Sequence, residues 1–398
     1  MKNIEINYFK WIKENVSNDS HSYFLPTYEQ CREICDANGN LIFYETKHEV
    51  DGYPISIFNY RLAQVANFIR PVDSNPVIKA NELRGLTFVF HKDGTLYKRF
   101  LLLDKFWNLN QEPQSAYSVV QNYKIRNIYD KLDGSIASFI QLPSGRVIGR
   151  SKASFISDQA IEIEKIYNRW SNIKKFIDWC MNEDIIPIME YVAPSNRIVV
   201  SYANTDLVLL RMRDNNTGEY LNIEDHTDKL DGISVAQSFS DHSLDTIQEV
   251  VIKMVGSEGV IVQFENGKMI KIKSPWYIER HKLFTQDLNH ESTLIKMIIE
   301  ETIDDVIPYI DDIKRKDINR ITNIINIYIK NTNKQVKNLI EEYTDIKTFA
   351  IKYSKSHLFP IAIGVIKGKD IMDLIKNKIL TDTKNLMSAR KWITDHDI

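Results

Sequence analysis

The chain has 398 residues, of which 43% are hydrophobic and 26% charged, and its formal net charge is −2. This length predicts two or three domains that each bury a core, and the composition is that of a folded rather than a disordered chain. The longest nearly apolar stretch, Leu358–Ile366, is far shorter than the roughly 18 residues that a membrane-spanning helix needs. We therefore expect no membrane association, and any nucleic acid must be bound by local basic residues.

The three cysteines are few, odd in number and irregularly spaced, which predicts neither a disulfide framework nor a paired zinc site. Charged residues interrupt the first sixteen positions, so that no signal-peptide apolar core is present. Both features indicate a reducing cytoplasm.

Taken in chain order, the first half is predicted to be mostly β-structure. Apolar residues from Tyr8 to Val16 recur at helical spacing, and three short strands follow, at Leu41–Tyr44, Ile55–Tyr60 and Leu86–Phe90. Strand-like runs are then separated by turn sequences whose residues tolerate positive φ, namely Asp93-Gly94, Pro143-Ser144-Gly145, Asn215-Asn216-Thr217-Gly218 and Asn266-Gly267. These hairpin turns predict antiparallel sheets.

Helices are predicted in two places. One long helix should run from Asp158 to about Met181, with Ser157 as its cap. After about Thr285 the chain has few glycines and its apolar residues recur at 3.6-residue spacing, which predicts a separate all-helical domain. The fold class is therefore α+β, with an antiparallel-sheet domain over residues 1–285 and a helical domain over 286–398. The one obvious basic cluster of the helical domain is Lys314-Arg315-Lys316. We interpret it as a solvated helix face, with an RNA contact as the alternative.

The sequence lacks a phosphate-binding P-loop, a dinucleotide fingerprint and a zinc-protease helix. Its most distinctive motif is Lys131-Leu132-Asp133-Gly134-Ser135, in which a lysine leaves a strand and enters an Asp-Gly turn. Alone, this K-x-D-G-S motif is also compatible with an ordinary charged hairpin turn, so its interpretation depends on the rest of the chain.

Two further segments place charged residues in strands. In Ile185–Val192, alternation puts Glu190 on the same face as two isoleucines, where a carboxylate requires a cationic or hydroxylic partner. The segment from Glu258 to Ser274 is predicted to form a hairpin around Asn266-Gly267.

A two-residue turn in that hairpin would pair Val262 with Lys271 and Val260 with Lys273, with Glu258 diagonal to Lys273. One face would then carry a carboxylate and two lysines. An edge strand with solvated lysines is the structural alternative.

Together these residues suit a nucleophilic lysine. At a pKa near 10.4 only about one lysine in 2,500 is neutral at pH 7, so a lysine nucleophile needs a site that depresses its pKa. Neighbouring cations do this, and they also neutralise a triphosphate when its α-phosphorus is attacked. Lys131, Lys271 and Lys273 fit these roles.

An ordered array of motifs resembles the covalent nucleotidyltransferase superfamily and, within it, the phage RNA ligase 1 family. The array comprises Arg84-Gly85, Leu101–Asn108, Lys131–Ser135, Arg150-Ser151-Lys152, Met189–Val199, Leu209–Tyr220, Glu258-Gly259 and Lys271–Tyr277. DNA ligases and capping enzymes continue into a glycine-bearing β-barrel, whereas this chain continues into a helical segment that resembles the carboxy-terminal domain of RNA ligase 1.

The resemblance implies roles for individual residues. Lys131 becomes the adenylated nucleophile within a turn that contains Asp133 and Gly134. Expected ATP contacts are Phe58, Arg84, Lys105, Glu190, Glu258, Lys271 and Lys273. Lys152 and Tyr277 match further functional positions, and Asp304 is a candidate metal ligand. The resemblance also implies ATP and Mg²⁺ as cosubstrate and metal, and the cytoplasm of a host if the chain is phage-encoded.

The implied reaction joins RNA ends that carry a 5′-phosphate and a 3′-hydroxyl, through lysyl-AMP and an adenylylated RNA, with nicked tRNA as the expected substrate. Two alternatives remain open: a GTP-dependent capping guanylyltransferase, and a non-catalytic RNA-binding relative with the same fold.

Overall fold

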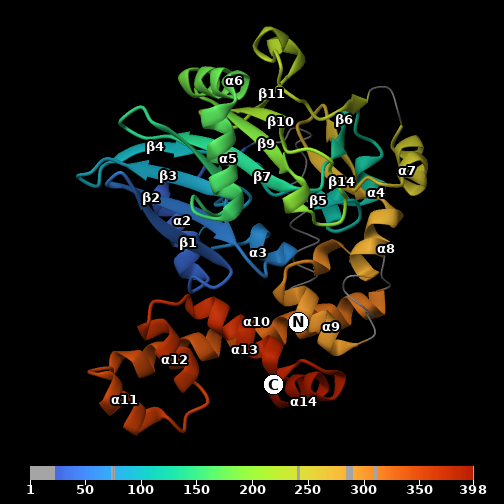
Figure 1. Cartoon of the computed structure of the whole chain (residues 1–398). Helices are drawn as coiled ribbons and strands as arrows, with labels where there is room; N and C mark the ends of the chain where they lie inside the picture. Colours follow the sequence, from blue (N-terminus) through green and yellow to red (C-terminus); the bar gives the residue numbers. More distant parts are fainter. Residues whose placement is uncertain are drawn as a thin grey trace. The chain divides into compact units, whose positions relative to one another are not determined.

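The computed structural model describes residues 23–72, 75, 77–239, 243–283, 290–305, 307 and 312–397 (Figure 1). The helix expected between Tyr8 and Val16 lies outside the described residues. The chain divides into two compact units. The sheet unit comprises Met1–Cys31, Thr46–Asn59 and Val77–Ile278, and the helical unit comprises Arg32–Glu45, Tyr60–Pro76 and Glu279–Ile398. Two short segments from the first 76 residues therefore belong with the helical residues, which the sequence did not indicate.

Three β-sheets build the first part of the chain. A four-stranded sheet has the order β1-β2-β3-β4, with strands at Phe43–Val50, Tyr53–Tyr60, Leu86–Phe90 and Leu96–Phe100. A second sheet has the order β11-β10-β9-β7-β8, with bounds, in that order, of Tyr220–Leu221, Asp206–Asp214, Ile185–Val192, Ser135–Gln141 and Val147–Ser151. The third has the order β12-β6-β13-β14-β5, at Ser238–Phe239, Ile125–Lys131, Gly259–Phe264, Met269–Lys273 and Trp107–Asn108.

Antiparallel pairing dominates these sheets. In the second and third sheets every neighbouring pair is antiparallel except β14 with β5. Each of the four predicted turns connects two consecutive strands. The predicted α+β class with antiparallel sheets is therefore confirmed.

The predicted register of the β13–β14 hairpin is wrong by one residue. Val262 pairs with Ile270 rather than with Lys271, and Lys273 pairs with Gly259. Phe264 N donates to Lys268 O, so the loop has three residues rather than two. Its last residue, Gly267, has φ +84°, the left-handed conformation that ends a three-residue hairpin loop. Gly267 therefore predicts that a turn forms here, but it does not predict the number of residues in the loop.

The predicted long helix is two helices, α5 (Asp158–Arg169) and α6 (Ser171–Asn182). Ser157 caps α5 as expected, because its hydroxyl accepts from Ala160 N at 3.2 Å. The break lies at Trp170, whose φ of −97° and ψ of 108° are extended. No proline or glycine marks this position, so the periodic pattern alone could not reveal the break. Helix α5 packs on β8 and α6 on β9.

The apolar core of the third sheet lies between its strands and a short helix. Buried Ile128, Val260 and Phe264 belong to one cluster with residues of α7. The remaining described helices before residue 290 are α2 (Tyr28–Ala37), α3 (Val65–Ile69), α4 (Tyr117–Val120), α7 (Leu244–Lys253) and α8 (Pro275–Leu283). Short 3₁₀ turns lie at Pro113–Ser115 (η1), Pro194–Asn196 (η2) and Glu224–Lys229 (η3).

The chain after α8 is helical wherever regular structure is described, drawn in orange and red in Figure 1. Its elements are α9 (Glu291–Ile299), η4 (Ile303–Asp305), α10 (Asp312–Glu341), α11 (Ile346–Tyr353), α12 (Phe359–Ile366), α13 (Ile371–Asp382) and α14 (Leu386–His396). The predicted spacing is borne out, since Ile318, Ile321, Ile325 and Ile329 all lie in one buried cluster. None of the described helices is long and apolar enough to cross a bilayer.

Candidate active site

A cavity of about 410 Å³ opens within the sheet unit. Its lining includes four cationic side chains and two carboxylates, namely Arg84, Lys131, Lys152, Lys271, Asp130 and Glu190. Apolar residues, including Leu103, Phe106, Leu210 and Ile261, complete the wall. A concave site with apolar walls and a few converging charges is typical of a site for a charged organic ligand.

Lys131 lies at the end of β6, where the strand runs into the Asp-Gly turn. Its Nζ is 2.6 Å from Glu258 Oε2, while Lys273 Nζ is 2.8 Å from Glu258 Oε1. One buried carboxylate therefore bridges two lysines. Burial alone would raise the pKa of the Glu258 carboxyl, but the two ammonium groups outweigh it and hold that pKa below its ordinary value.

Two glycines permit close approaches at this site. A Cβ on Gly134 would lie 2.5 Å from Tyr191 O, and Gly134 N donates to Glu190 Oε1 at 3.0 Å. A Cβ on Gly259 would lie 2.1 Å from Ile272 O, and the φ of Gly259 is +143°. Larger residues at either position would push the nucleophile turn away from β9, or β13 away from β14.

Glu190 is buried on β9, but all eight residues of this strand are buried, so burial does not distinguish the face that its alternation predicted. Burial raises the pKa of its carboxyl to about 8, and the nearby Lys131 ammonium only partly offsets this effect. The carboxyl can therefore both accept from Gly134 N and carry a proton near neutral pH, which suits a hydrogen bond with a hydroxyl group.

Lys271 has a different environment from Lys273, two residues further along the same strand. Burial is the main cause that lowers its pKa well below the ordinary value, and repulsion by Lys105, Arg84, Lys131 and Lys273 adds to it. Its Nζ lies 5.0 Å from the centre of the Phe106 ring. Part of Lys271 remains accessible from the cavity that it lines.

Asp133 joins the nucleophile turn to neighbouring segments. Its Oδ2 accepts from the backbone N of Val199 and of Val200 at 2.8 and 2.7 Å, and its Oδ1 accepts from Tyr277 OH at 2.9 Å. Its own backbone N donates to Tyr202 OH at 2.9 Å. Asp133 and Tyr277 therefore position the turn. Sequence reasoning missed Tyr202, because nothing in its spacing indicates this contact.

A buried ion pair supports the segments that carry Arg84 and Lys105. Arg213 Nη1 and Nη2 donate to Glu82 at 2.8 and 2.6 Å, and Nη1 also donates to Leu102 O at 2.6 Å. Beside it, the hydroxyl of Tyr220 donates to Asp104 Oδ1 at 2.6 Å. Because Glu82 and Asp104 lie within two residues of Arg84 and Lys105, this network orders both segments.

Three further predicted residues lie in different surroundings. Lys105 is buried with its Nζ 4.3 Å from the centre of the Trp107 ring. Phe58 is fully buried in an aromatic cluster with Tyr28 and Phe88 and does not line the cavity, where the aromatic ring is that of Phe106. The sequence motif included Phe106, but its spacing did not distinguish it from its neighbours.

Asp304, the candidate metal ligand, lies in η4 of the helical unit and not in the cavity. Among the residues that the structure describes, no three histidine, cysteine, aspartate or glutamate side chains are grouped to hold a metal. The described residues therefore do not form a metal site that is built by protein ligands alone. Mg²⁺ often retains several waters and binds through substrate phosphates together with one or two carboxylates.

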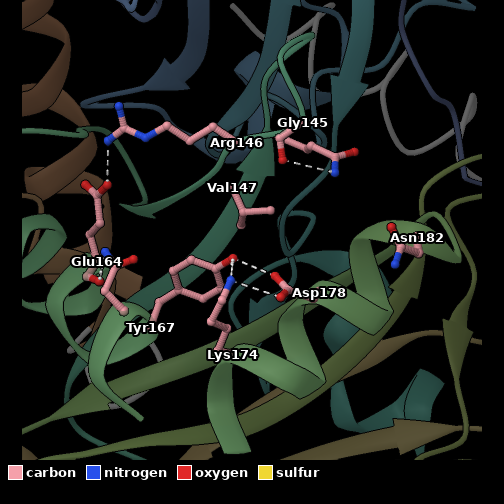
Figure 2. Close-up of a pocket in the computed structure, with 10 residues that line it drawn as sticks. Gly145, Arg146, Val147, Glu164, Tyr167, Lys174, Asp178 and Asn182 are labelled. Atoms are coloured by element: carbon pink, nitrogen blue, oxygen red, sulfur yellow. Dashed lines mark hydrogen bonds and ion pairs between the residues drawn. The ribbon is translucent and has the colours of Figure 1, made fainter. Parts of the chain in front are cut away.

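A second, polar pocket of about 490 Å³ lies between the β7–β8 hairpin and helices α5 and α6. Figure 2 shows that its charged groups pair with one another: Arg146 with Glu164 at 2.9 Å, and Lys174 with Asp178 at 3.0 Å. Tyr167 OH donates to Asp178 Oδ1 as well. Because these groups satisfy one another, the first cavity is the better candidate for a charged ligand.

Comparisons with known proteins show what the chain is similar to. A family model described as RNA ligase matches residues 82–277, which include every proposed site residue except Phe58 and Asp304. A putative RNA ligase of Thermovibrio ammonificans is 27% identical over 258 residues, which cover 62% of this chain and 66% of that protein. The match thus spans slightly less than two thirds of the relative.

Two solved structures are also similar. An archaeal ATP-dependent RNA ligase has a TM-score of 0.45 at 12% identity, covering 84% of this chain and 92% of the other. A Naegleria gruberi RNA ligase with PPi has a TM-score of 0.36 at 16% identity, covering 45% and 57%. Over residues 82–277, slightly less than half of the chain, the sequence therefore resembles the RNA ligase family.

Proposed function

We propose that the protein is an ATP-dependent RNA ligase. The observation that carries this proposal is that Lys131 lines one cavity together with Arg84, Lys152, Lys271 and Glu190. Cations of this kind stabilise the charge that develops as a phosphoanhydride is opened. A lysine at the end of a strand, in the same cavity, is positioned to attack an α-phosphorus.

The reaction has three steps. Lys131 takes AMP from ATP and releases pyrophosphate, the AMP passes to an RNA 5′-phosphate, and a 3′-hydroxyl then displaces AMP to seal the strand. Arg84, Lys105, Lys152, Lys271 and Lys273 are the proposed phosphate contacts, and Glu190 is the proposed partner of a ribose hydroxyl. Mg²⁺ is proposed to arrive with the ATP phosphates.

Incubation with labelled ATP tests the first step. The protein should acquire one AMP on Lys131, and Lys131→Ala should acquire none. Lys124→Ala is a matched control on the same segment, because the Lys124 side chain is 78% exposed and pairs only with Glu265. Label that persists on Lys131→Ala, or maps to another lysine, contradicts the assignment.

The same experiment separates the alternatives. Labelling from GTP but not from ATP would favour a capping guanylyltransferase, and no labelling from either would favour a non-catalytic RNA-binding relative. The helical chain after α8 argues against the capping enzyme, since that class continues into a β-barrel.

We further propose that the natural substrate is nicked tRNA and that the helical domain, residues 286–398, selects it. The basic residues Lys314 and Lys316 near the start of α10 are the candidate contacts. The double variant Lys314→Glu/Lys316→Glu should retain self-labelling but lose preference for a nicked anticodon loop over linear RNA with the same ends. An unchanged preference would remove this cluster from the proposal.

The proposed setting is a reducing cytoplasm, that of a host if the gene is carried by a phage. All three cysteines are buried, and thiols remain reduced in such a compartment. A loss of self-labelling under reducing conditions would contradict this setting.

A further inference from the structure

The first step of the proposed reaction poses a proton problem. A lysine attacks phosphorus only as a neutral amine. In this structure, Lys131 Nζ lies 2.6 Å from Glu258 Oε2 in an ion pair, so a proton must leave the lysine before it attacks. Glu258 is a poor acceptor for the proton, because Lys131 and Lys273 both stabilise its ionised form. Another group must accept it.

Lys271 is the group whose surroundings favour the neutral amine. The charged groups that act on it most strongly are cations: Arg84 before β3, Lys105 after β4, Lys131 on β6 and Lys273 on its own strand. Asp130 on β6 and Glu190 on β9 are the carboxylates that line the same cavity. No carboxylate pairs with Lys271 among the described residues, whereas Lys273 pairs with Glu258 at 2.8 Å. The face of Phe106 offers only a weak cation–π contact.

Lys271 is also in the right place to exchange a proton with the nucleophile. Both lysines line the same cavity of about 410 Å³, and Lys131 is one of the cations that act on Lys271. Strand β13 lies between β6 and β14, so Lys131 and Lys271 are held on strands of one sheet. Part of Lys271 is accessible from the cavity, where a water can connect the two amines.

We propose that Lys271 is the proton acceptor for Lys131 in lysyl-AMP formation. The inference rests on the proposed ligase function and assigns a second role to a residue otherwise expected only to contact phosphate. When a triphosphate enters the cavity, its negative charge stabilises the protonated form of Lys271. Binding of ATP thereby drives the transfer that frees the nucleophile.

The step balances as follows. The Lys131 ammonium gives one proton to the neutral Lys271 amine, which becomes an ammonium beside the triphosphate. The freed Lys131 lone pair forms the N–P bond, and the bond from the α-phosphorus to the bridging oxygen breaks with its electron pair on pyrophosphate. The new phosphoramidate nitrogen loses a second proton to the departing pyrophosphate. Lys271 leaves the step charged and returns its proton to solvent after pyrophosphate departs.

The test compares two arginine variants of the full chain, Lys271→Arg and Lys273→Arg. Arginine keeps the positive charge but cannot serve as a base near neutral pH. The single-turnover rate of lysyl-AMP formation from saturating ATP should fall about 100-fold or more in Lys271→Arg, the usual contribution of a general base. This rate should fall less in Lys273→Arg, because Lys273 is already charged and paired with Glu258.

The pH dependence separates a proton role from a clamping role. In Lys271→Arg, the rate should rise about tenfold per pH unit from pH 6 to pH 9, because Lys131 must then lose its proton to solvent. The unmodified enzyme should show a flatter profile over the same range. A lost phosphate contact would lower the rate at every pH without changing the slope.

A rescue completes the test. Lys271→Cys can be aminoethylated with 2-bromoethylamine to restore an amine at this position, and the three native cysteines are buried and should react slowly. Aminoethylation should raise the rate of Lys271→Cys at least tenfold at pH 7, and it should restore the flatter profile.

Equal losses in the two arginine variants with parallel pH profiles would overturn the role of Lys271 while leaving the ligase proposal intact. Absence of lysyl-AMP in the unmodified protein would instead overturn the ligase proposal. Lys131→Ala is the negative control in all of these measurements, because it lacks the proposed nucleophile.

Discussion

The two units of this protein differ in how they use charge. The described interior of the sheet unit contains ion pairs, such as Arg213 with Glu82, whose side chains are 0% and 3% exposed. The described ion pairs from α9 onwards are at least partly exposed, such as Lys391 with Asp395, at 75% and 48%, although Glu45 of the helical unit is buried where it pairs with Arg32. The interior of the helical unit is mainly isoleucine, leucine and methionine. Buried charges are costly unless paired, so their concentration in one unit indicates where the chemistry is.

Among the described residues of the sheet unit, perturbed acid and base groups gather around the first cavity. Glu190, Glu258 and Lys271 lie within a few strands of one another, and their shifts arise from burial together with mutual attraction or repulsion. The helical unit presents its charges to water, where screening leaves such pairs with little energy. Four predictions test this contrast.

The largest effect is expected from breaking the buried pair. Arg213→Met should destabilise the protein by about 3–5 kcal/mol, because Glu82 would be left buried without its cation. The matched change in the helical unit, Arg320→Met, removes two surface ion pairs, with Asp317 and Asp397, and should still cost less than the buried pair, at about 1 kcal/mol. Urea denaturation measures both. Similar losses would show that the two units do not differ in this respect.

The helical unit should instead depend on apolar packing. Ile325→Ala on α10 should cost about 2–5 kcal/mol, since Ile325 is fully buried in the isoleucine cluster. Ile327→Ala is its control on the same helix, because Ile327 is 49% exposed. Thermal or urea unfolding followed by circular dichroism should separate the two variants clearly. A small loss for Ile325→Ala would mean that the cluster contributes little.

The third prediction concerns pH. Because burial raises the pKa of Glu190 to about 8, the folded protein holds a proton there that the unfolded chain releases near pH 4.5. The unfolded state therefore binds fewer protons between these values, and this group lowers stability as pH rises from about 4.5 to 8. Glu190→Gln should remove that loss.

Denaturation at pH 5 and pH 8 checks this prediction. The stability of Glu190→Gln relative to the unmodified protein should be greater at pH 8 than at pH 5 by more than about 1.4 kcal/mol, the equivalent of one pKa unit. Glu342→Gln is the control in the helical unit, because hydrogen bonds from Lys352 and Tyr353 hold the pKa of that exposed carboxyl below its usual value. Its variant should not gain stability at high pH.

The smallest effects should be equal in the two units. Ser157 caps α5 and Asp345 caps α11, each by accepting backbone N–H bonds of the first helical turn. Ser157→Ala and Asp345→Ala should each cost about 1 kcal/mol, because a cap is a local interaction that does not depend on the charge of the surrounding core. Unequal losses in urea denaturation would show that the surroundings matter even here.

Local features of this protein followed from its sequence. Strand β3 has the predicted bounds, the Ser157 cap forms, and the four turn sequences each join two strands. The α+β class and the resemblance to RNA ligases over residues 82–277 also follow, because the motifs and the change in periodicity after residue 285 are properties of the chain order itself. These features depend on backbone conformation and on residues close in sequence.

Tertiary structure decided the remaining features. The hairpin register depends on a loop length that Gly267 permits but does not specify, and the break at Trp170 depends on how two helices pack on one sheet. The bridge from Glu258 to Lys131 and Lys273 joins two strands that are far apart in sequence. The environment of Lys271 is set by cations from four separate segments. Electrostatic surroundings depend on distances and burial in space, which spacing along the chain does not determine.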